Sequence, residues 1–116
     1  MKHFFGLSLL VLLLILGSCE MVTLEPFSDV PDDLSLADDI QPIFNSNCIT
    51  CHGGSRAPDL RSGKSYSSLV TGGFIDTAEP ENSDIVIVFE GSHSSRASDK
   101  EKAYILGWIK QGAKNN

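Results

Sequence analysis

The feature that constrains this chain most is a run of five residues near its middle, Cys48-Ile49-Thr50-Cys51-His52. Two thiols stand three positions apart and an imidazole follows the second one directly, so all three groups leave the backbone within one short turn. This spacing is typical of covalent haem attachment. The two cysteines can form thioethers with the two vinyl groups of one haem c, and the histidine can place a ring nitrogen on its iron.

Three other interpretations of the same residues compete with haem. Cys48 and Cys51 could form a structural disulfide outside the cytoplasm. A thioredoxin-like redox pair would require a βαβ context, which the sequence lacks. Zinc bound by both cysteines together with His52 and His93 has the right number of ligands, but the adjacent Cys51 and His52 would enter one tetrahedron with difficulty.

The composition of the chain also favours a cofactor. The chain has 116 residues, and its first 18 residues hold 12 of its hydrophobic side chains but only one Lys or Arg. The remainder is therefore poor in apolar residues and long enough for one small domain, which excludes a multidomain enzyme. Domains of this size often depend on a disulfide, a metal or a cofactor for stability.

The N-terminal segment predicts export and a lipid anchor. A short basic start and an apolar run, Phe4 to Leu16, fit residues 1–18 as a signal peptide, because the run is too short to span a bilayer comfortably. Leu16-Gly17-Ser18-Cys19 resembles the lipobox of bacterial lipoproteins. The resemblance implies that Cys19 is lipidated and that the chain is tethered to a membrane, on the periplasmic side or at the cell surface.

An acidic spacer is predicted between the anchor and the domain, at residues 19–35, with the domain at residues 36–116. Seven of the chain's 15 acidic residues precede Arg56, the first basic residue after Lys2. The alternative is that Leu24, Phe27 and Val30 dock on the domain. No basic stripe is present, so nucleic acid is not an expected partner.

Periodicity predicts short helices and no sheet, hence an all-α domain. The first helix is expected near residues 37–46, a turn capped by Ser65 is expected to follow, and the final helix is expected from the Ser98/Glu101 capping box to Gly112. Pro80 is expected to open a helix over residues 80–90. The β-branched run in residues 85–89 leaves a buried strand as the alternative there.

Residues 36–112 resemble a small class I monohaem cytochrome c domain of exported lipoproteins from Bacteroidetes-like bacteria. The matching stretches are residues 39–44, which lead into the Cys-x-x-Cys-His run and Gly53-Gly54, then residues 57–60, 80–83 and 105–113. The resemblance implies a cytochrome c-like fold, with short helices around one covalently attached haem.

The resemblance also assigns positions around the haem. It implies that the first and last helices cross near the haem edge, with Phe44 and Trp108 as partners there or as ordinary core residues. It further implies that the Pro58 carbonyl accepts the proton on the second ring nitrogen of His52. The alternative for Pro58 is a loop proline that only fixes φ.

The sixth iron ligand is where this chain departs from the family, whose members commonly use methionine. The only methionines are Met1 and Met21, and after residue 18 the only histidines are His52 and His93. We therefore predict bis-histidine ligation by His52 and His93. The alternative is an open or water-filled sixth site with His93 exposed in its loop.

These features predict a membrane-anchored electron carrier rather than an enzyme, acting as a monomer with redox partner proteins. An open iron site would instead favour a small-ligand sensor or a peroxidase-like enzyme, with His93 and Arg96 as distal groups. A lipoprotein without haem that binds a protein partner is the third possibility. Hydrolase and nucleotide-binding motifs do not stand out in the sequence.

Overall fold

The computed structural model describes residues 29–116. The predicted signal peptide, the lipidation site Cys19 and the first part of the spacer, including Leu24 and Phe27, lie outside the described residues. The described chain is helical, and no strand occurs in it. Its elements are η1 (Leu36–Ile40), α2 (Gln41–Asn47), α3 (Ser65–Thr71), η2 (Pro80–Asn82), α4 (Asp84–Ile87), η3 (Val88–Glu90) and α5 (Asp99–Lys110). The all-α prediction is confirmed.

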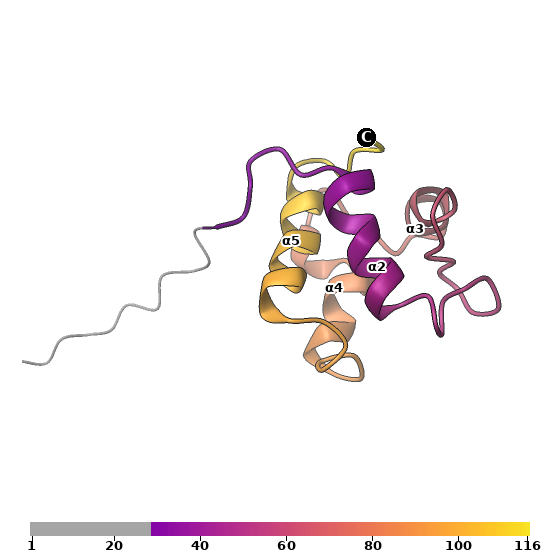
Figure 1. Ribbon diagram of the computed structural model, residues 1–116. Helices are drawn as coiled ribbons and strands as arrows, with labels where there is room; N and C mark the ends of the chain where they lie inside the picture. The colour runs from indigo at the N-terminus through magenta and orange to yellow at the C-terminus, as the bar shows by residue number, and fades with distance from the viewer. Residues whose placement is uncertain (1–28) are drawn as a thin grey trace, which may run out of the picture.

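The first and last helices run in opposite directions through the domain (Figure 1). The C-terminal end of α2 and the N-terminal end of α5 therefore lie at the same end of the molecule, together with the loop that joins η3 to α5. A fully buried core holds these elements together, and its members are Leu34, Leu36, Ile40, Ile43, Phe44, Leu60, Leu69, Ile85, Ile105, Trp108, Ile109 and Ala113. Burial of such side chains is the main favourable contribution to folding.

Helix α5 has the ends that its sequence predicts. The Ser98 hydroxyl accepts a hydrogen bond from the Glu101 backbone N–H, and the Glu101 carboxylate accepts one from the Ser98 N–H, which completes the capping box. After the helix, Gly112 adopts a φ of +96°, a conformation that glycine reaches without steric cost. Ile105, Trp108 and Ile109 form its buried face.

The β-branched run at residues 85–89 is helical, so the strand alternative is wrong. The expected single helix is nevertheless divided, because Ser83 adopts an extended ψ of 132° between η2 and α4. The Ser83 side chain is buried and accepts a hydrogen bond from the Asp76 N–H at 2.9 Å. This contact holds the break in place, and Ile85 enters the core directly after it.

The predicted capping role of Ser65 is wrong. Lys64 occupies the N-cap position of α3, and Ser65 lies inside the first turn. The Ser65 hydroxyl is buried and donates to Gln41 Oε1 at 2.5 Å, so it joins α3 to the start of α2. The predicted stop at Gly72-Gly73 is confirmed, with Gly73 at a φ of +76°.

Residues 30–35, which the sequence analysis assigned to the spacer, pack on α5. Leu34 is 1% exposed, and Val30 lies against the core. Gln111 holds this strap at two points: its Oε1 accepts from the Leu34 N–H at 2.8 Å, and its Nε2 donates to the Pro31 carbonyl at 2.7 Å. A Cβ on Gly107 would lie 2.6 Å from Val30 Cγ1, so glycine allows the close approach.

We expect Gln111→Ala to lower the free energy of unfolding by roughly 1–3 kcal/mol, because both strap hydrogen bonds are lost and the N–H of the buried Leu34 is left without its partner. Chemical denaturation of the haem-loaded protein would measure the change. Asn115→Ala is a suitable control, since this exposed side chain forms no hydrogen bond in the described residues. Equal stability of both variants would contradict a structural role of the strap.

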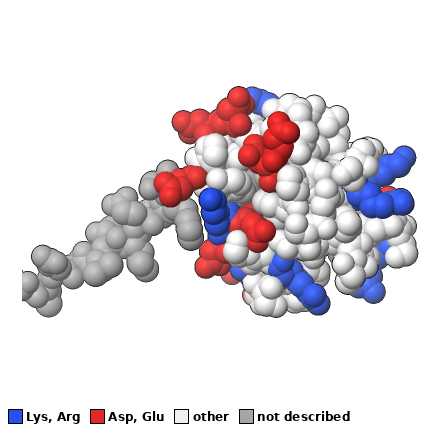
Figure 2. Space-filling model, viewed as in Figure 1, with Lys and Arg blue, Asp and Glu red and all other residues white. Residues whose placement is uncertain are grey.

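Charge is unevenly distributed over the surface. Five exposed or half-exposed acidic residues lie between residues 29 and 39, and Arg56, Arg61 and Lys64 lie in the segment after the Cys-x-x-Cys-His run. Figure 2 shows acidic atoms gathered on the side where the described chain begins, and mainly basic atoms on the opposite side. None of the helices in residues 29–116 has the length and apolar character needed to cross a membrane.

Candidate haem-binding site

The Cys-x-x-Cys-His run forms the turn that directly follows α2. Cys48 is the C-cap of α2 and its N–H donates to the Phe44 carbonyl at 2.9 Å, while the His52 N–H donates to the Cys48 carbonyl at 2.9 Å. Cys48 is half-buried, Cys51 is exposed, and both are free thiols. The turn therefore presents two cysteines and one histidine from a backbone that α2 holds in place.

The loop after the turn folds back onto His52. The Leu60 N–H donates to the His52 carbonyl at 2.8 Å, and His52 Nδ1 lies 3.1 Å from the Pro58 carbonyl oxygen. A carbonyl oxygen can only accept, so the proton of the neutral ring resides on Nδ1 and the lone pair on Nε2. This is the contact that the sequence analysis expected of Pro58, and it prepares Nε2 as a metal ligand.

Two glycines make this fold-back possible. A Cβ on Gly53 would lie 2.7 Å from the Ile49 carbonyl oxygen, a backbone atom that cannot move without disturbing the turn. Gly54 has a φ of +103°, which side chains other than that of glycine rarely adopt. Steric constraints therefore explain why two glycines directly follow His52.

The structure brings His93 next to His52 although 41 positions separate them in the chain. Their ring centroids are 6.2 Å apart, with 44° between the ring planes. Ser92 Oγ lies 2.8 Å from His93 Nδ1, so this nitrogen, like that of His52, has a hydrogen-bond partner. The two imidazoles are tilted to one another and form the only close pair of aromatic rings among residues 29–116.

The spacing of the two rings fits one metal ion between them. An imidazole nitrogen lies about 2 Å from a transition metal that it ligates. Two rings on opposite sides of one ion then have centroids roughly 6 Å apart, since each ring adds its own radius to that distance. The observed 6.2 Å matches this arrangement. His52 and His93 would therefore be the residues to hold a haem iron, which would supply a one-electron couple there.

The environment of the cysteines disfavours two of the other interpretations, the redox pair and the zinc site. Burial raises the pKa of the Cys48 thiol, and the negative charge of Glu101 raises it further. Reactive cysteines of redox pairs have lowered pKa values instead, because the thiolate is the nucleophile. Within the described residues, no group of three or more His, Cys, Asp or Glu side chains is arranged to hold a metal ion, so the four proposed zinc ligands do not gather.

Phe44 and Trp108 lie in the common core and are both fully buried. The expected stacked or edge-to-face contact between them is absent from the described residues, where His52 and His93 are the only close ring pair. The Trp108 indole N–H donates to the Lys114 carbonyl at 2.9 Å. Ordinary core packing, the alternative in the sequence analysis, describes both residues.

A contact near the site that the sequence did not predict joins α2 to α5. Asn47, which precedes Cys48, donates from Nδ2 to Glu101 Oε1 at 3.0 Å. Hydrogen bonds from the Ser98 backbone and side chain, and from Asn47, lower the pKa of Glu101. The sequence showed only the Ser98/Glu101 spacing, which gave no indication that Glu101 also accepts a hydrogen bond from Asn47.

Glu101→Gln is expected to make the stability of the protein less sensitive to acid. A lowered pKa in the folded state stabilises the protein above the ordinary value of 4.5. This stability is lost as the pH falls through the folded-state pKa of Glu101. Denaturation midpoints of the two proteins should therefore differ above pH 4.5 and converge only at pH values below the folded-state pKa of Glu101. Glu90→Gln, at an exposed carboxylate without a hydrogen bond in the described chain, should leave the wild-type profile unchanged.

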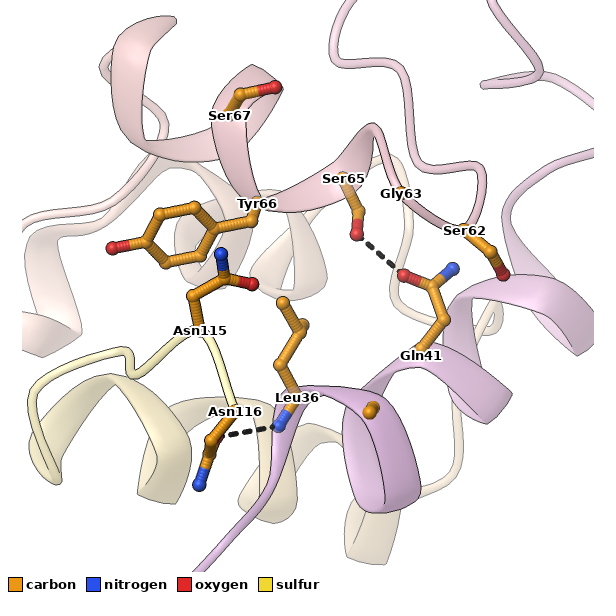
Figure 3. A pocket seen from close by; sticks show the side chains of 10 residues that line it. Leu36, Gln41, Ser62, Gly63, Ser65, Tyr66, Ser67, Asn115 and Asn116 are labelled. Atoms are coloured by element: carbon orange, nitrogen blue, oxygen red, sulfur yellow. Dashed lines mark hydrogen bonds between the residues drawn. The ribbon is translucent and has the colours of Figure 1, made fainter.

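A pocket of about 450 Å³ lies elsewhere, between the start of α2, α3 and the C-terminal residues (Figure 3). Its lining has no charged side chain and includes Tyr66, Asn115 and Gln41. The buried amide of Gln41 accepts from Ser65 and donates to the Leu60 carbonyl at 2.9 Å, so the protein satisfies it internally. None of the two cysteines and two histidines lines this pocket.

No family model, no curated protein and no solved structure matches this chain.

Proposed function

We propose that this chain is a membrane-anchored c-type cytochrome that carries single electrons through one covalently bound haem c. The observation that carries the proposal is the placement of His93 opposite His52, with ring centroids 6.2 Å apart, beside two free cysteines in one turn. The all-α domain with four short helices is compatible with a cytochrome c-like fold.

Each residue of the site has a separate task in this proposal. Cys48 and Cys51 form the two thioethers, and His52 Nε2 is the proximal ligand. The Pro58 carbonyl holds the proton on His52 Nδ1 and so keeps the ring in the ligating tautomer. His93 is the sixth ligand. When bound, the haem supplies a one-electron couple between ferric and ferrous iron.

Two axial histidines favour electron transfer over ligand binding or peroxide chemistry. With both positions taken by protein nitrogens, no site remains for an exogenous ligand on the iron. Arg96, the other distal group considered for a peroxidase-like enzyme, is exposed and belongs to the same loop as His93. A histidine in place of methionine as the sixth ligand lowers the reduction potential, because methionine favours the reduced iron.

The anchor and the charge distribution complete the proposal. Lipidated Cys19 would tether the domain to a membrane, with the domain outside the cytoplasm. Five acidic residues lie between positions 29 and 39, and Arg56, Arg61 and Lys64 follow the Cys-x-x-Cys-His run in the sequence. Figure 2 shows acidic atoms on the side where the described chain begins and mainly basic atoms on the opposite side. A redox partner protein would approach the haem-bearing turn, where Cys51 is exposed.

Protein exported by a host that attaches haem provides the test. We expect a red protein whose intact mass exceeds that of the lipidated polypeptide by one haem, and whose ferric spectrum is low-spin and six-coordinate. Colourless protein with the mass of polypeptide plus lipid would refute the proposal. Haem that carbon monoxide binds readily in the reduced protein would instead support the open-site alternative.

A further inference from the structure

The loop that carries His93 has few contacts of its own. Residues 91–97 are exposed except for His93 and Ala97, which are half-buried. The His93 N–H donates to the Val88 carbonyl at 2.9 Å, which attaches the loop to the first residue of η3. The other hydrogen bonds inside it connect near neighbours, such as the Arg96 N–H with the His93 carbonyl at 3.0 Å. A segment packed so loosely opens easily unless another element holds it.

Helix α5 provides that hold through one side chain. Lys102 Nζ donates to the Ser94 carbonyl at 2.7 Å, one residue after His93. Only 24% of the Lys102 side chain is exposed, although it belongs to a surface turn. The contact with Asp99, at 3.5 Å, is longer and stays within the same turn. The ammonium group is therefore committed mainly to the loop, as a charge-assisted hydrogen bond.

The neighbouring residue in the same turn holds the other side of the site. Glu101 accepts from Asn47 at 3.0 Å, and Asn47 directly precedes Cys48. Since α2, α5 and the His93 loop meet at one end of the domain (Figure 1), the first turn of α5 contacts both chain segments that carry the histidines. Glu101 fixes this turn relative to the haem motif, and Lys102 fixes the His93 loop relative to the same turn.

We propose that Lys102 is a positioning residue that holds His93 at ligand distance from His52. The inference rests on the proposed function, because the distance matters only if both histidines bind one iron. Without the Lys102 bond, the loop remains attached at Val88, and His93 leaves and rejoins the iron more often. The consequence is a sixth position that opens transiently to small ligands.

The experiment compares three variants of the haem-loaded protein. Lys102→Met removes the hydrogen bond and keeps most of the side-chain stem. Lys100→Met is the matched control, because it removes the same charge from the same turn, and Lys100 lies over the Tyr104 ring at 5.4 Å rather than on the loop. Lys102→Arg retains a donor and a positive charge and should restore the contact. The readout is the rate at which the reduced protein binds carbon monoxide.

We expect carbon monoxide to bind Lys102→Met about tenfold faster than wild type, the factor that one charge-assisted hydrogen bond supplies. Lys100→Met and Lys102→Arg should stay near the wild-type rate. A wild-type rate in Lys102→Met, while His93→Ala binds carbon monoxide freely, would overturn the role of Lys102 and leave the bis-histidine site intact. Equal acceleration in both methionine variants would also overturn it, as an effect of charge alone. A His93→Ala protein that stays low-spin and six-coordinate, or a chain without haem, would refute the ligation itself.

Discussion

Replacement of both Cys48 and Cys51 by serine is expected to abolish covalent haem attachment completely. A serine hydroxyl does not form the thioether, so only the bond from His52 could hold the cofactor, and denaturation would break it. The expected result is a chain that shows no haem after denaturing electrophoresis and has the mass of the polypeptide plus its lipid. Retention of haem under those conditions would contradict the proposed attachment.

The control for this experiment lies inside the same turn. Thr50 stands between the two cysteines and is exposed, so Thr50→Ala should keep full covalent haem. Thr50→Ala should keep the haem because the geometry of the turn depends on two backbone hydrogen bonds. The Cys51 and His52 N–H groups donate these bonds to the Cys48 carbonyl, at 3.1 and 2.9 Å. Loss of haem in Thr50→Ala would show that the double variant disturbs the turn rather than the thioethers.

Local patterns in the sequence predicted the local parts of the fold. The Ser98/Glu101 capping box and the stop at Gly112 are confirmed, because each depends on residues within one helical turn. Ser65 failed as a cap because its hydroxyl binds Gln41, 24 positions away, inside the core. No local pattern contains such a partner.

The boundary of the domain was missed for a similar reason. The sequence analysis assigned Leu34 and Val30 to an acidic spacer, since charged residues surround them in the sequence. Leu34 is buried and Val30 is partly buried because Gln111 and Gly107, more than 70 positions later, supply two hydrogen bonds and the space for close packing. The alternative in the sequence analysis was docking of Leu24, Phe27 and Val30, and its part at Val30 occurs, while Leu24 and Phe27 lie outside the described residues.

In the candidate site, too, contacts between sequence neighbours were predicted and most contacts between distant residues were not. The Cys-x-x-Cys-His run and the Pro58 contact lie within eleven consecutive residues, so the sequence pattern predicted them. His93 was identified by elimination, as the one other histidine after the leader, and the structure places its ring beside that of His52. The contacts of Asn47 with Glu101 and of Lys102 with Ser94 were not foreseen, because amide, carboxylate and ammonium groups on a surface helix usually face solvent.

Replacement of His93 by alanine is expected to convert the iron from six-coordinate and low-spin to a form with an open position. Reduced His93→Ala should bind carbon monoxide stoichiometrically, whereas the wild-type protein should bind it slowly or not at all. His93→Met should keep six ligands but raise the reduction potential, because a thioether favours ferrous iron more than imidazole does. Absorption spectra and redox titration would measure both effects.

Arg96→Ala separates ligation from a general disturbance of the loop. Arg96 lies three residues from His93 and is exposed, and it contributes its backbone N–H rather than its side chain to the loop. This variant should therefore keep the wild-type spectrum and potential. If His93→Ala and Arg96→Ala both remain low-spin and six-coordinate, His93 is not the sixth ligand. If both variants have an open coordination position on the iron, the loop as a whole rather than the His93 imidazole determines coordination. Only an effect confined to His93 agrees with the proposed ligation by two imidazoles, whose ring centroids lie 6.2 Å apart.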